Sequence, residues 1–544
     1  MRRETRNFGV RRDEFNNIDR RGAKLHRVFL LDLGAPGVPY SGMARSILTT
    51  PATTQRPYVS KSKFRWGCQC RKLLWYAYNA KDQIPEPDAA QQAIFDQGHE
   101  VGALAKSLYP GGMEVSAGVT DFEQVLRQSL MAAKARKPLF EAGFVHSGGF
   151  ARVDILNPVG RDAWDIIEVK SSTEVKDVNL LDLAFQAFVY NGAGLNIRRC
   201  YLMHVSRHYV RPGPVDPKKF FKLVDVTKDV SGLSRDIEPQ LEDMFRTIRR
   251  KQEPDIQIGP HCSDPNPCPL QDRCWAFLPP DNVTNLYYGG KKCWRLLGDG
   301  ILRLKDIPDS VDMTDRQAIQ RKAALTGQPH VDRKALATFL KRLKYPVGYL
   351  DFETFNTAIP LFDGLTPFQQ VPFQFSLHRQ VVPNAKPEHH AFLADGRGDP
   401  RPEFLNRLRD CIGDTGAVVV YNAKFEKGVL DRLANAFPEH TGWIDGVKAR
   451  IIDLLDPFQS FDYYHPEQHG SASIKAVLPA LTGRSYADLE IQEGGQANLE
   501  YMRVHFGEVS QDERRKVREQ LERYCGQDTE GMLWVVDALR ALLG

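Results

Sequence analysis

The C-terminal part of the chain alternates between continuous apolar runs and amphipathic ones. The runs "VGYLDFETF" (347–355) and "GAVVVYNA" (416–423) are apolar enough to predict buried strands. The stretch "DERRKVREQLERYCGQDTEGMLWVVDALRALL" (512–543) has the longer apolar spacing of a helix. Strands that alternate with helices indicate an α/β fold for this part of the chain.

Earlier in the chain, "FARVDILNPVGRDAWDIIEVKSS" (150–172) shows two alternating apolar strands around "NPVGRDA", which predicts a β-hairpin. A Pro- and Cys-rich stretch at 259–280 marks a boundary, and short helical patterns follow it. We therefore expect four segments. They are a basic extension predicted to be disordered (1–57), a first α/β domain (58–280), a helical connector (281–344) and a second α/β domain (345–544).

Composition narrows the class of protein. The chain has 544 residues, of which 42% are apolar and 26% charged, and no apolar run is long enough for a membrane span. We expect a soluble, multidomain protein. The net charge of +5 permits a polyanionic partner without requiring one. Nine cysteines without a signal peptide indicate a reducing, cytoplasmic location.

The predicted hairpin carries the first group of chemically informative residues. Asp154 lies among apolar residues of the first strand, and Glu168 and Lys170 share one face of the second strand. Two such carboxylates can hold a divalent cation while the ammonium group steadies charge at a scissile phosphate. The alternative is a solvated salt bridge on an edge hairpin.

This hairpin, followed by "NLLDLAFQAFVYNGAG" with Gln186 and Tyr190 one helical turn apart, resembles the RecB-like branch of the PD-(D/E)XK nucleases. The resemblance implies that fold, and it implies Asp154 and Glu168 as metal ligands, with Lys170, Gln186 and Tyr190 completing the catalytic set. These enzymes often place a metal-binding His on a preceding helix. Here Gly102 stands at that position, so His99, Glu100 or neither completes the ligand set.

Cysteines bracket this predicted domain. Three lie in the Pro-rich boundary and one far upstream in "CRKLLWY": Cys262, Cys268, Cys274 and Cys70. Four thiolates can hold zinc or an iron–sulfur cluster, and would join the two ends of the domain. The arrangement resembles the iron–sulfur nucleases of the RecB-like group, which implies a 4Fe-4S cluster; Zn²⁺ is the alternative metal and Cys68 the alternative ligand. We interpret Cys200, Cys293, Cys411 and Cys525 as structural.

A second group of carboxylates begins in the strand "VGYLDFETF". Asp351 and Glu353 are two residues apart, so they point to one face, and buried carboxylates are costly unless they are paired or bound to metal. Further along, Glu426 follows a strand in the first turn of a predicted helix, and Tyr524 and Asp528 lie four apart on another.

This order of motifs resembles the DEDD 3′-to-5′ exonucleases of the ribonuclease H-like superfamily, in the subtype with Tyr in the third motif. The resemblance implies that Asp351, Glu353, Glu426 and Asp528 hold two Mg²⁺ or Mn²⁺ ions while Tyr524 positions the attacking water. Glu426 departs from the family, which usually has Asp there. The segment also looks like a domain of unknown function found behind RecB-like nucleases in bacteria.

Together these patterns predict a metal-dependent nuclease that acts on DNA, through unpaired strands or ends, in DNA repair or mobile-element defence. We favour DNA over RNA as the partner and expect no membrane association; protein partners are not predicted. One alternative is a nucleic-acid-binding protein or scaffold in which one or both sites are inactive, as the residues at 102 and 426 would allow. Another is an RNA exonuclease. "LLGDGILRLKDIPD" (296–309) weakly resembles a helix-hairpin-helix, although a plain connector is the simpler interpretation.

Overall fold

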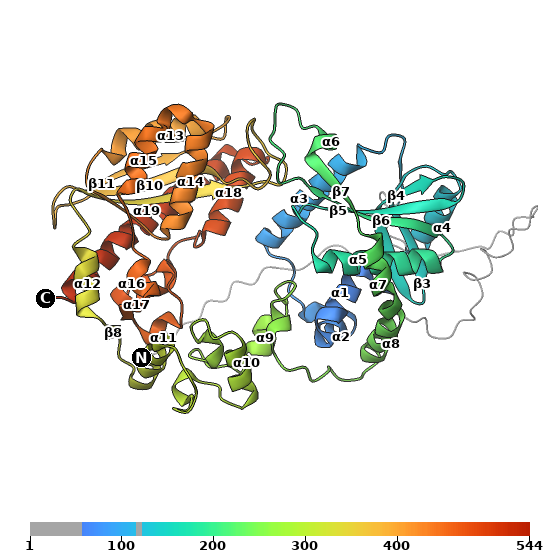
Figure 1. Cartoon of the computed structure of the whole chain (residues 1–544), viewed down its shortest axis with the longest axis horizontal. Coiled ribbons are helices and arrows are strands. Elements are labelled where there is room, and N and C mark those ends of the chain that lie inside the picture. The colour runs from blue at the N-terminus through green and yellow to red at the C-terminus, as the bar shows by residue number, and fades with distance from the viewer. Residues whose placement is uncertain (1–56, 116–121) are drawn as a thin grey trace, which may run out of the picture. The chain divides into compact units, whose positions relative to one another are not determined.

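The computed structural model describes residues 57–115 and 122–544, which form a mixed α/β, multidomain protein (Figure 1). The prediction of a disordered extension at 1–57 falls almost entirely outside the described residues. Two large hydrophobic cores lie in different parts of the sequence, one within residues 59–248 and one within 336–539. Within the described ranges, no helix has the length and apolar character needed to cross a membrane.

A seven-stranded sheet organises the first core. Its strand order is β2-β3-β4-β5-β6-β7, with β1 paired to β4. The strands are β1 (Val59–Ser60), β2 (Met113–Glu114), β3 (Leu139–His146), β4 (Gly149–Val159), β5 (Ala163–Lys170), β6 (Asn196–Val205) and β7 (Phe221–Asp225). The predicted hairpin is β4 and β5, and its turn is only 160–162, because Asn157 and Pro158 continue the strand pairing.

Helices pack around this sheet because each has an apolar side. The helix α5 (Asp177–Gly192) buries Leu183, Phe185 and Tyr190 against β3, β4 and β6. The other helices of this part are α1 (Lys61–Gln69), α2 (Arg71–Asn79), α3 (Ala89–Lys106), α4 (Phe122–Ala133), α6 (Pro217–Phe220), α7 (Thr227–Leu233), α8 (Ile237–Ile248) and α9 (Gln271–Trp275).

The connector has a small core of its own, which includes Val283, Leu296 and Ile307. It contains α10 (Lys291–Gly298) and α11 (Asp315–Thr326), and a short 3₁₀ turn, Leu304–Asp306, lies between them. The segment suggested as a helix-hairpin-helix is thus the end of α10 followed by this turn. Asp332 caps α12 (Arg333–Leu340) through a hydrogen bond from the Ala335 N–H.

A five-stranded sheet organises the second core. Its order is β11-β10-β9-β12-β13. The strands are β9 (Val347–Phe355), β10 (Val371–Gln380), β11 (Glu388–Leu393), β12 (Ala417–Val420) and β13 (Ile451–Asp453). The strand β9 lies at the centre, antiparallel to β10 and parallel to β12. Both faces of the sheet are covered by helices, which explains why β9 is almost continuously apolar.

The two faces of β9 contact different helices. Phe352 meets Phe404 of α13 (Arg401–Ile412), whereas Phe355 stacks on Tyr501 of α18 (Gly494–Phe506). Since side chains alternate along a strand, Asp351 and Glu353 share the Phe355 face. That face is also covered by the long helix α19 (Gln511–Ala541), whereas α14 (Ala423–Ala436) and α15 (Thr441–Ala449) lie with α13 (Figure 1).

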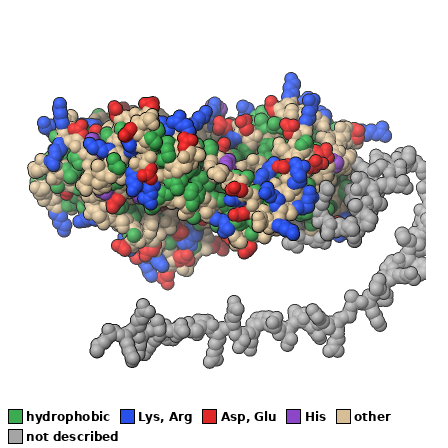
Figure 2. All heavy atoms as spheres, turned by 90° about the horizontal axis from the view of Figure 1, so that it is seen from below, with side chains coloured by type: hydrophobic (Ala, Val, Ile, Leu, Met, Phe, Trp, Pro, Cys, Tyr) green, Lys and Arg blue, Asp and Glu red, His purple; other side chains and the backbone are tan. Residues whose placement is uncertain are grey.

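On the face drawn in Figure 2, lysine and arginine side chains are interspersed with aspartate and glutamate side chains. This mixture agrees with the small net charge of +5. Any binding of a polyanion would therefore depend on local features, and these are best sought at the candidate sites.

Candidate functional site

Three carboxylates meet on the face of β9 that is covered by α18 and α19. Asp351 and Glu353 come from the strand and Asp528 comes from α19, and each offers an oxygen atom that lies within 4.8 Å of the other two. Glu353 and Asp528 are 7% and 6% exposed, whereas Asp351 is half-buried, so water reaches the group mainly at Asp351. An all-oxygen donor set of this kind fits a hard divalent cation such as Mg²⁺ or Mn²⁺.

The electrostatics of this acid cluster are unfavourable for three ionised groups. Burial raises the pKa of Asp351 and Glu353 well above their ordinary values, and the neighbouring carboxylates add to this effect. Burial also raises the pKa of Asp528 to about 6, although a hydrogen bond from Tyr486 opposes the shift. The cluster therefore needs protons or a cation to be stable.

Neighbouring side chains fix the cluster. The Tyr486 hydroxyl donates to Asp528 Oδ1 at 2.7 Å, and the Cys525 thiol contacts Asp351 Oδ2 at 3.7 Å. Lys475 Nζ donates to the Tyr524 hydroxyl at 3.1 Å. The lysine ammonium group therefore fixes Tyr524, which the sequence analysis predicted at this site. Sequence reasoning missed Tyr486 and Lys475, and it placed Cys525 among structural cysteines although the thiol adjoins the cluster.

Glu426 lies beside the cluster but outside the group of three. It is 1% exposed in the first turn of α14, and its Oε2 atom has no hydrogen-bond partner among the described residues. Burial, followed by the charge of Asp351, raises the pKa of Glu426 to about 9. The preceding Asn422 has φ of 81°, and Asp453 holds this turn by accepting the N–H groups of Asn422 and Ala423 at 2.9 and 2.7 Å. Asp453 also escaped the sequence analysis, although an acid at the end of an apolar strand could have indicated it.

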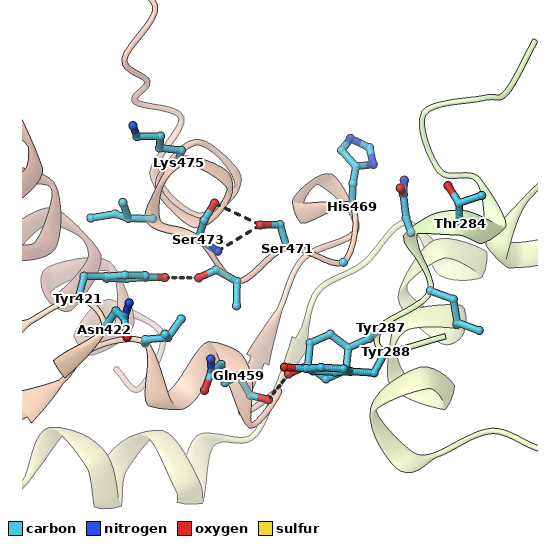
Figure 3. A pocket seen from close by; sticks show the side chains of 16 residues that line it. Thr284, Tyr287, Tyr288, Tyr421, Asn422, Gln459, His469, Ser471, Ser473 and Lys475 are labelled. Atoms are coloured by element: carbon cyan, nitrogen blue, oxygen red, sulfur yellow. Dashed lines mark hydrogen bonds between the residues drawn. The ribbon is translucent and has the colours of Figure 1, made fainter. Parts of the chain in front are cut away.

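A cleft of about 710 Å³ lies between residues of the connector and residues of the second domain (Figure 3). One wall comes from the connector and includes Tyr287 and Tyr288. The other wall comes from the second domain and includes Asn422, at the start of the helix that carries Glu426, and Lys475, which contacts Tyr524. The cleft therefore includes two residues that neighbour the candidate site, whereas its lining does not include the acids themselves.

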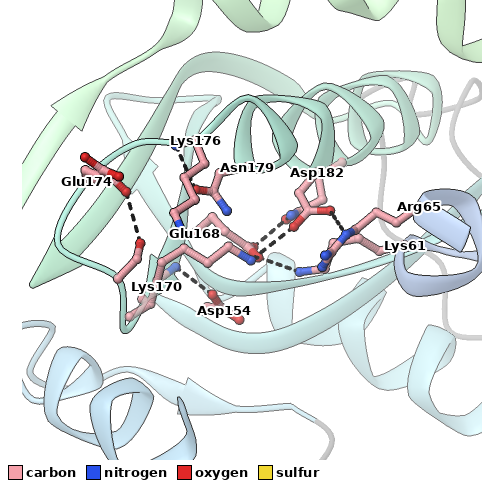
Figure 4. A network of polar contacts seen from close by, with 12 residues as sticks. Lys61, Arg65, Asp154, Glu168, Lys170, Glu174, Lys176, Asn179 and Asp182 are labelled. Atoms are coloured by element: carbon pink, nitrogen blue, oxygen red, sulfur yellow. Dashed lines mark hydrogen bonds and ion pairs between the residues drawn. The ribbon is translucent and has the colours of Figure 1, made fainter. Parts of the chain in front are cut away.

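The hairpin of the first sheet forms a second polar centre (Figure 4). The carboxylate of Glu168, 1% exposed, accepts from Lys170 and Lys61 through Oε1, each at 2.7 Å, and from Gln186 through Oε2 at 2.8 Å. Asp154 Oδ2 accepts the Val169 N–H at 2.6 Å. The structure thus places Asp154, Glu168, Lys170 and Gln186 together.

Lysine and arginine side chains compensate two acids of this centre, Glu168 and Asp182. Burial alone would raise the pKa of Glu168, but Lys170 and Lys61 overcome it and hold the pKa well below its ordinary value. Burial, with the charge of Glu168, raises the pKa of Asp154 to about 7. The buried Asp182 pairs with Lys170 Nζ at 3.1 Å and with Arg65 Nε at 3.5 Å. Sequence reasoning missed Lys61, Arg65 and Asp182; the pair Lys61 and Arg65, one helical turn apart in α1, was the available signal.

Two other residues of the first predicted site have different surroundings. Tyr190 is fully buried, and its hydroxyl donates to the Ala142 carbonyl and accepts the Val153 N–H, so it joins β3 and β4. His99 and Glu100 are exposed on α3, and in the described part of the chain no hydrogen bond or ion pair joins either to Asp154 or Glu168. A side chain at Gly102 would have open space around its Cβ atom.

The four predicted cysteine ligands line one small cavity. Cys70 lies at the junction of α1 and α2, and it meets Cys262, Cys268 and Cys274 there. Burial raises the pKa of Cys268 to about 11, and the charges of the other three thiols contribute to the increase. The alternative ligand Cys68 instead donates to Gln240 Oε1 at 3.2 Å. The donor set fits either zinc or an iron–sulfur cluster.

Comparisons with known proteins match parts of the chain. Residues 348–473 match the family described as "Domain of unknown function (DUF2779)". The "Uncharacterized protein MG366 homolog" of Mycoplasma pneumoniae is 25% identical over 228 residues, which are 37% of this chain and 34% of the relative. "Uncharacterized protein MG366" of Mycoplasma genitalium is 25% identical over 227 residues, 37% of this chain and 33% of the relative. The chain thus spans about a third of the length of these curated relatives. A solved structure, "Crystal structure of SSO0001", is 11% identical with a TM-score of 0.20, covering 42% of this chain and 90% of that one.

Proposed function

We propose that the chain is a metal-dependent nuclease whose principal active site is the acid cluster of β9 and α19. The observation that carries the proposal is the meeting of the half-buried Asp351 with the buried Glu353 and Asp528 within 4.8 Å. Mg²⁺ or Mn²⁺ bound by such carboxylates supplies an activated water and stabilises the leaving oxygen of a phosphodiester. The proposed fold of this domain is ribonuclease H-like, with β9 as its central strand.

The chain's own residues have separate tasks in this proposal. Asp351, Glu353 and Asp528 hold the cations, and Glu426 offers an unpartnered oxygen to a second one. Tyr486 orients Asp528, while the hydroxyl of Tyr524, held by Lys475, orients the attacking water. The burial of Glu353 and Asp528 limits the access of water to the cluster and strengthens these interactions.

We propose the hairpin centre as a second nuclease site, of the RecB-like PD-(D/E)XK kind, with Asp154 and Glu168 as ligands and Lys170 and Gln186 beside them. One contact favours the rival possibility that this centre is inactive and binds nucleic acid only. Lys61 donates to the same Glu168 oxygen as Lys170, so a cation at Glu168 must compete with an ammonium group already present.

The test uses the full chain with Mg²⁺ or Mn²⁺ and labelled single- and double-stranded DNA and RNA. Wild type is compared with Asp351→Ala and Lys170→Ala. We expect each substitution to abolish a separate activity. Asp351→Ala should abolish the exonuclease activity of the acid cluster, and Lys170→Ala should abolish the nuclease activity of the hairpin centre. If wild type degrades none of the four substrates with either metal, the enzyme proposal is wrong. Degradation of RNA alone would identify an RNA exonuclease.

We further propose a 4Fe-4S cluster on Cys70, Cys262, Cys268 and Cys274, because all four thiols line one cavity. Anaerobically purified protein should be brown, with broad visible absorption that is lost in Cys274→Ser. Cys68→Ser is the matched control and should keep the colour, since Cys68 contacts Gln240 instead. If the protein is colourless and contains stoichiometric zinc, the four cysteines form a structural zinc site and the cluster proposal is wrong.

A further inference from the structure

The cleft beside the acid cluster has a wall that the second domain does not supply. Tyr287 and Tyr288 belong to the connector, and the opposite wall contains Tyr421, Asn422 and Lys475 (Figure 3). The volume of about 710 Å³ falls in the range of about 300–1,000 Å³ that is usual for ligand sites. Because the two walls come from different segments, contacts between and within the segments must hold the walls in place.

Specific contacts fix the connector wall. Gln320 Oε1 accepts the Tyr287 N–H, Gln317 Nε2 donates to the Tyr287 carbonyl, and Gln320 Nε2 donates to the Asn285 carbonyl, each at 2.8 Å. The Tyr287 ring packs edge-on against Phe461 of the second domain, with ring centroids 4.8 Å apart. Tyr287 is therefore a structural anchor, and it presents the next residue to the cleft.

Tyr288 is unusual in two independent ways. Its side chain is 86% exposed, although a tyrosine ring normally buries much of its apolar area. Its backbone has φ of 45°, a left-handed conformation that is unfavourable for a bulky L-residue. An exposed aromatic ring held in a strained conformation at the rim of a cleft is typical of a ligand contact rather than of a folding requirement.

One residue of the second-domain wall links the cleft to the candidate site. Lys475 lines the cleft and donates to the Tyr524 hydroxyl at 3.1 Å. Its ammonium group can neutralise a phosphate that approaches the carboxylates. A strand lying in the cleft would thus have an aromatic ring on one wall and, on the other wall, a lysine that contacts Tyr524 of the candidate site.

We propose that this cleft binds an unpaired nucleic-acid strand, with a base stacked on Tyr288 and the backbone directed past Lys475 to the acid cluster. The inference rests on the proposed nuclease function, for which it names the substrate form. An unpaired strand is favoured because a base can stack on a protein ring only when it is free of its own helical stack. Stacking tolerates any base, so little sequence preference is expected.

The test measures binding without hydrolysis. Fluorescence anisotropy of a labelled oligo(dT) or oligo(U) is recorded with the full chain in EDTA at low salt. Tyr288→Ala should weaken binding by about 5- to 100-fold, the range expected for the loss of one base stack. Tyr288→Phe keeps the ring and should bind as wild type. Phe277→Ala, which removes another exposed aromatic ring (58% exposed) outside the cleft, is the matched control and should also bind as wild type.

A second measurement does not depend on affinity. An oligonucleotide that carries 5-iodouracil should photo-crosslink to Tyr288, as mapped by mass spectrometry of the wild-type chain. Equal affinity of wild type and Tyr288→Ala, together with crosslinks elsewhere, would overturn the inference while leaving a nuclease activity intact. If binding depends on Tyr288 but no substrate is hydrolysed in Mn²⁺, the proposed binding cleft is supported and the proposed nuclease function is wrong. Comparison of the affinities for oligo(dT) and oligo(U) shows whether the cleft prefers DNA or RNA.

Discussion

The two acidic centres of the chain differ in how their buried carboxylates are compensated. At the hairpin of β4 and β5, Glu168 receives two ammonium groups and an amide, so its charge is balanced by the protein itself. At β9, Asp351, Glu353 and Asp528 face one another, and the nearby ammonium group of Lys475 donates to the Tyr524 hydroxyl and to the Gln492 carbonyl. Buried ion pairs persist when every charge has a partner, whereas clustered acids require protons or cations. The charge of Glu168 at the first centre is thus balanced by protein groups, whereas the second centre requires protons or a cation.

The largest expected effect comes from Asp351→Asn. Removing a ligand from the acid cluster should lower exonuclease activity by more than about 100-fold, beyond the roughly 10–100-fold seen when only supporting residues are changed. The same variant should lose the part of the Mn²⁺-dependent rise in melting temperature that comes from binding at the acid cluster. Lys170→Met is the control for the other centre and should retain that Mn²⁺ stabilisation. An Asp351→Asn chain that Mn²⁺ still stabilises fully would show that the cation binds elsewhere.

In the absence of metal, the two centres should respond to neutralisation with opposite signs. Glu168→Gln leaves Lys61 and Lys170 without their common carboxylate and should destabilise the first domain by about 3–5 kcal/mol. Asp351→Asn removes repulsion between buried acids and should raise the melting temperature of the second domain. Thermal unfolding in EDTA measures both effects. Destabilisation by both variants would contradict the distinction drawn between the centres.

Glu426 provides a smaller test of the acid cluster. Its carboxyl group has a pKa of about 9, because it is buried near Asp351, so at neutral pH it is protonated in the metal-free chain. Glu426→Gln therefore preserves both shape and charge and should leave metal-free stability nearly unchanged. It should weaken Mn²⁺ binding by about 10-fold, measured by titration calorimetry, if Glu426 reaches a cation. Glu426→Asp is the companion variant, since it keeps a carboxyl group but shortens the side chain by one methylene. Unchanged Mn²⁺ affinity in Glu426→Gln would remove residue 426 from the ligand set.

Local patterns in the sequence predicted the elements that carry these residues. Alternation and turn chemistry predicted the β4 and β5 hairpin, and the four-residue spacing predicted that Tyr524 and Asp528 share a face of α19. What could not be predicted were partners from distant segments. Lys61 lies 107 residues from Glu168, and Tyr486 lies 42 residues from Asp528. Such contacts depend on how helices dock on the sheet, which periodicity does not encode.

The same limit explains the residues whose role changed. Cys525 lies far in the sequence from the clustered cysteines, which predicted a structural thiol, yet helix docking brings it to Asp351. Tyr190 matches a nuclease motif by spacing, whereas its hydroxyl bonds the backbone of β3 and β4. The cleft with Tyr288 needs two segments to meet, and the connector wall that carries Tyr288 contains no recognisable motif by itself.

The smallest expected effect concerns the histidine that lies on β10, next to the strand of the acid cluster. Burial, together with the neighbouring His389, lowers the pKa of His378 to about 4, and its Nδ1 atom lies 2.8 Å from the Thr529 hydroxyl. In the unfolded chain this imidazole is protonated below about pH 6.5. Between pH 6.5 and 4 the unfolded state therefore binds more protons, and the stability contributed by His378 decreases as the pH falls. The acid cluster has the opposite sign, since its raised pKa values make the metal-free fold more stable as the pH falls towards the unfolded values.

His378→Asn separates the two contributions, because the amide can retain a hydrogen bond to Thr529 but does not titrate. Stability should fall less between pH 7 and 5 in the variant than in the wild type, by on the order of 1 kcal/mol after allowance for solvent screening. Melting temperatures across that pH range in EDTA provide the measurement, and Asp351→Asn should shift the same curve in the other direction. Parallel curves for wild type and His378→Asn would mean that the imidazole is equally accessible to protons in both states. The pH dependence of the second domain would then come from its carboxylates and from His505, whose pKa is also lowered to about 4 by burial.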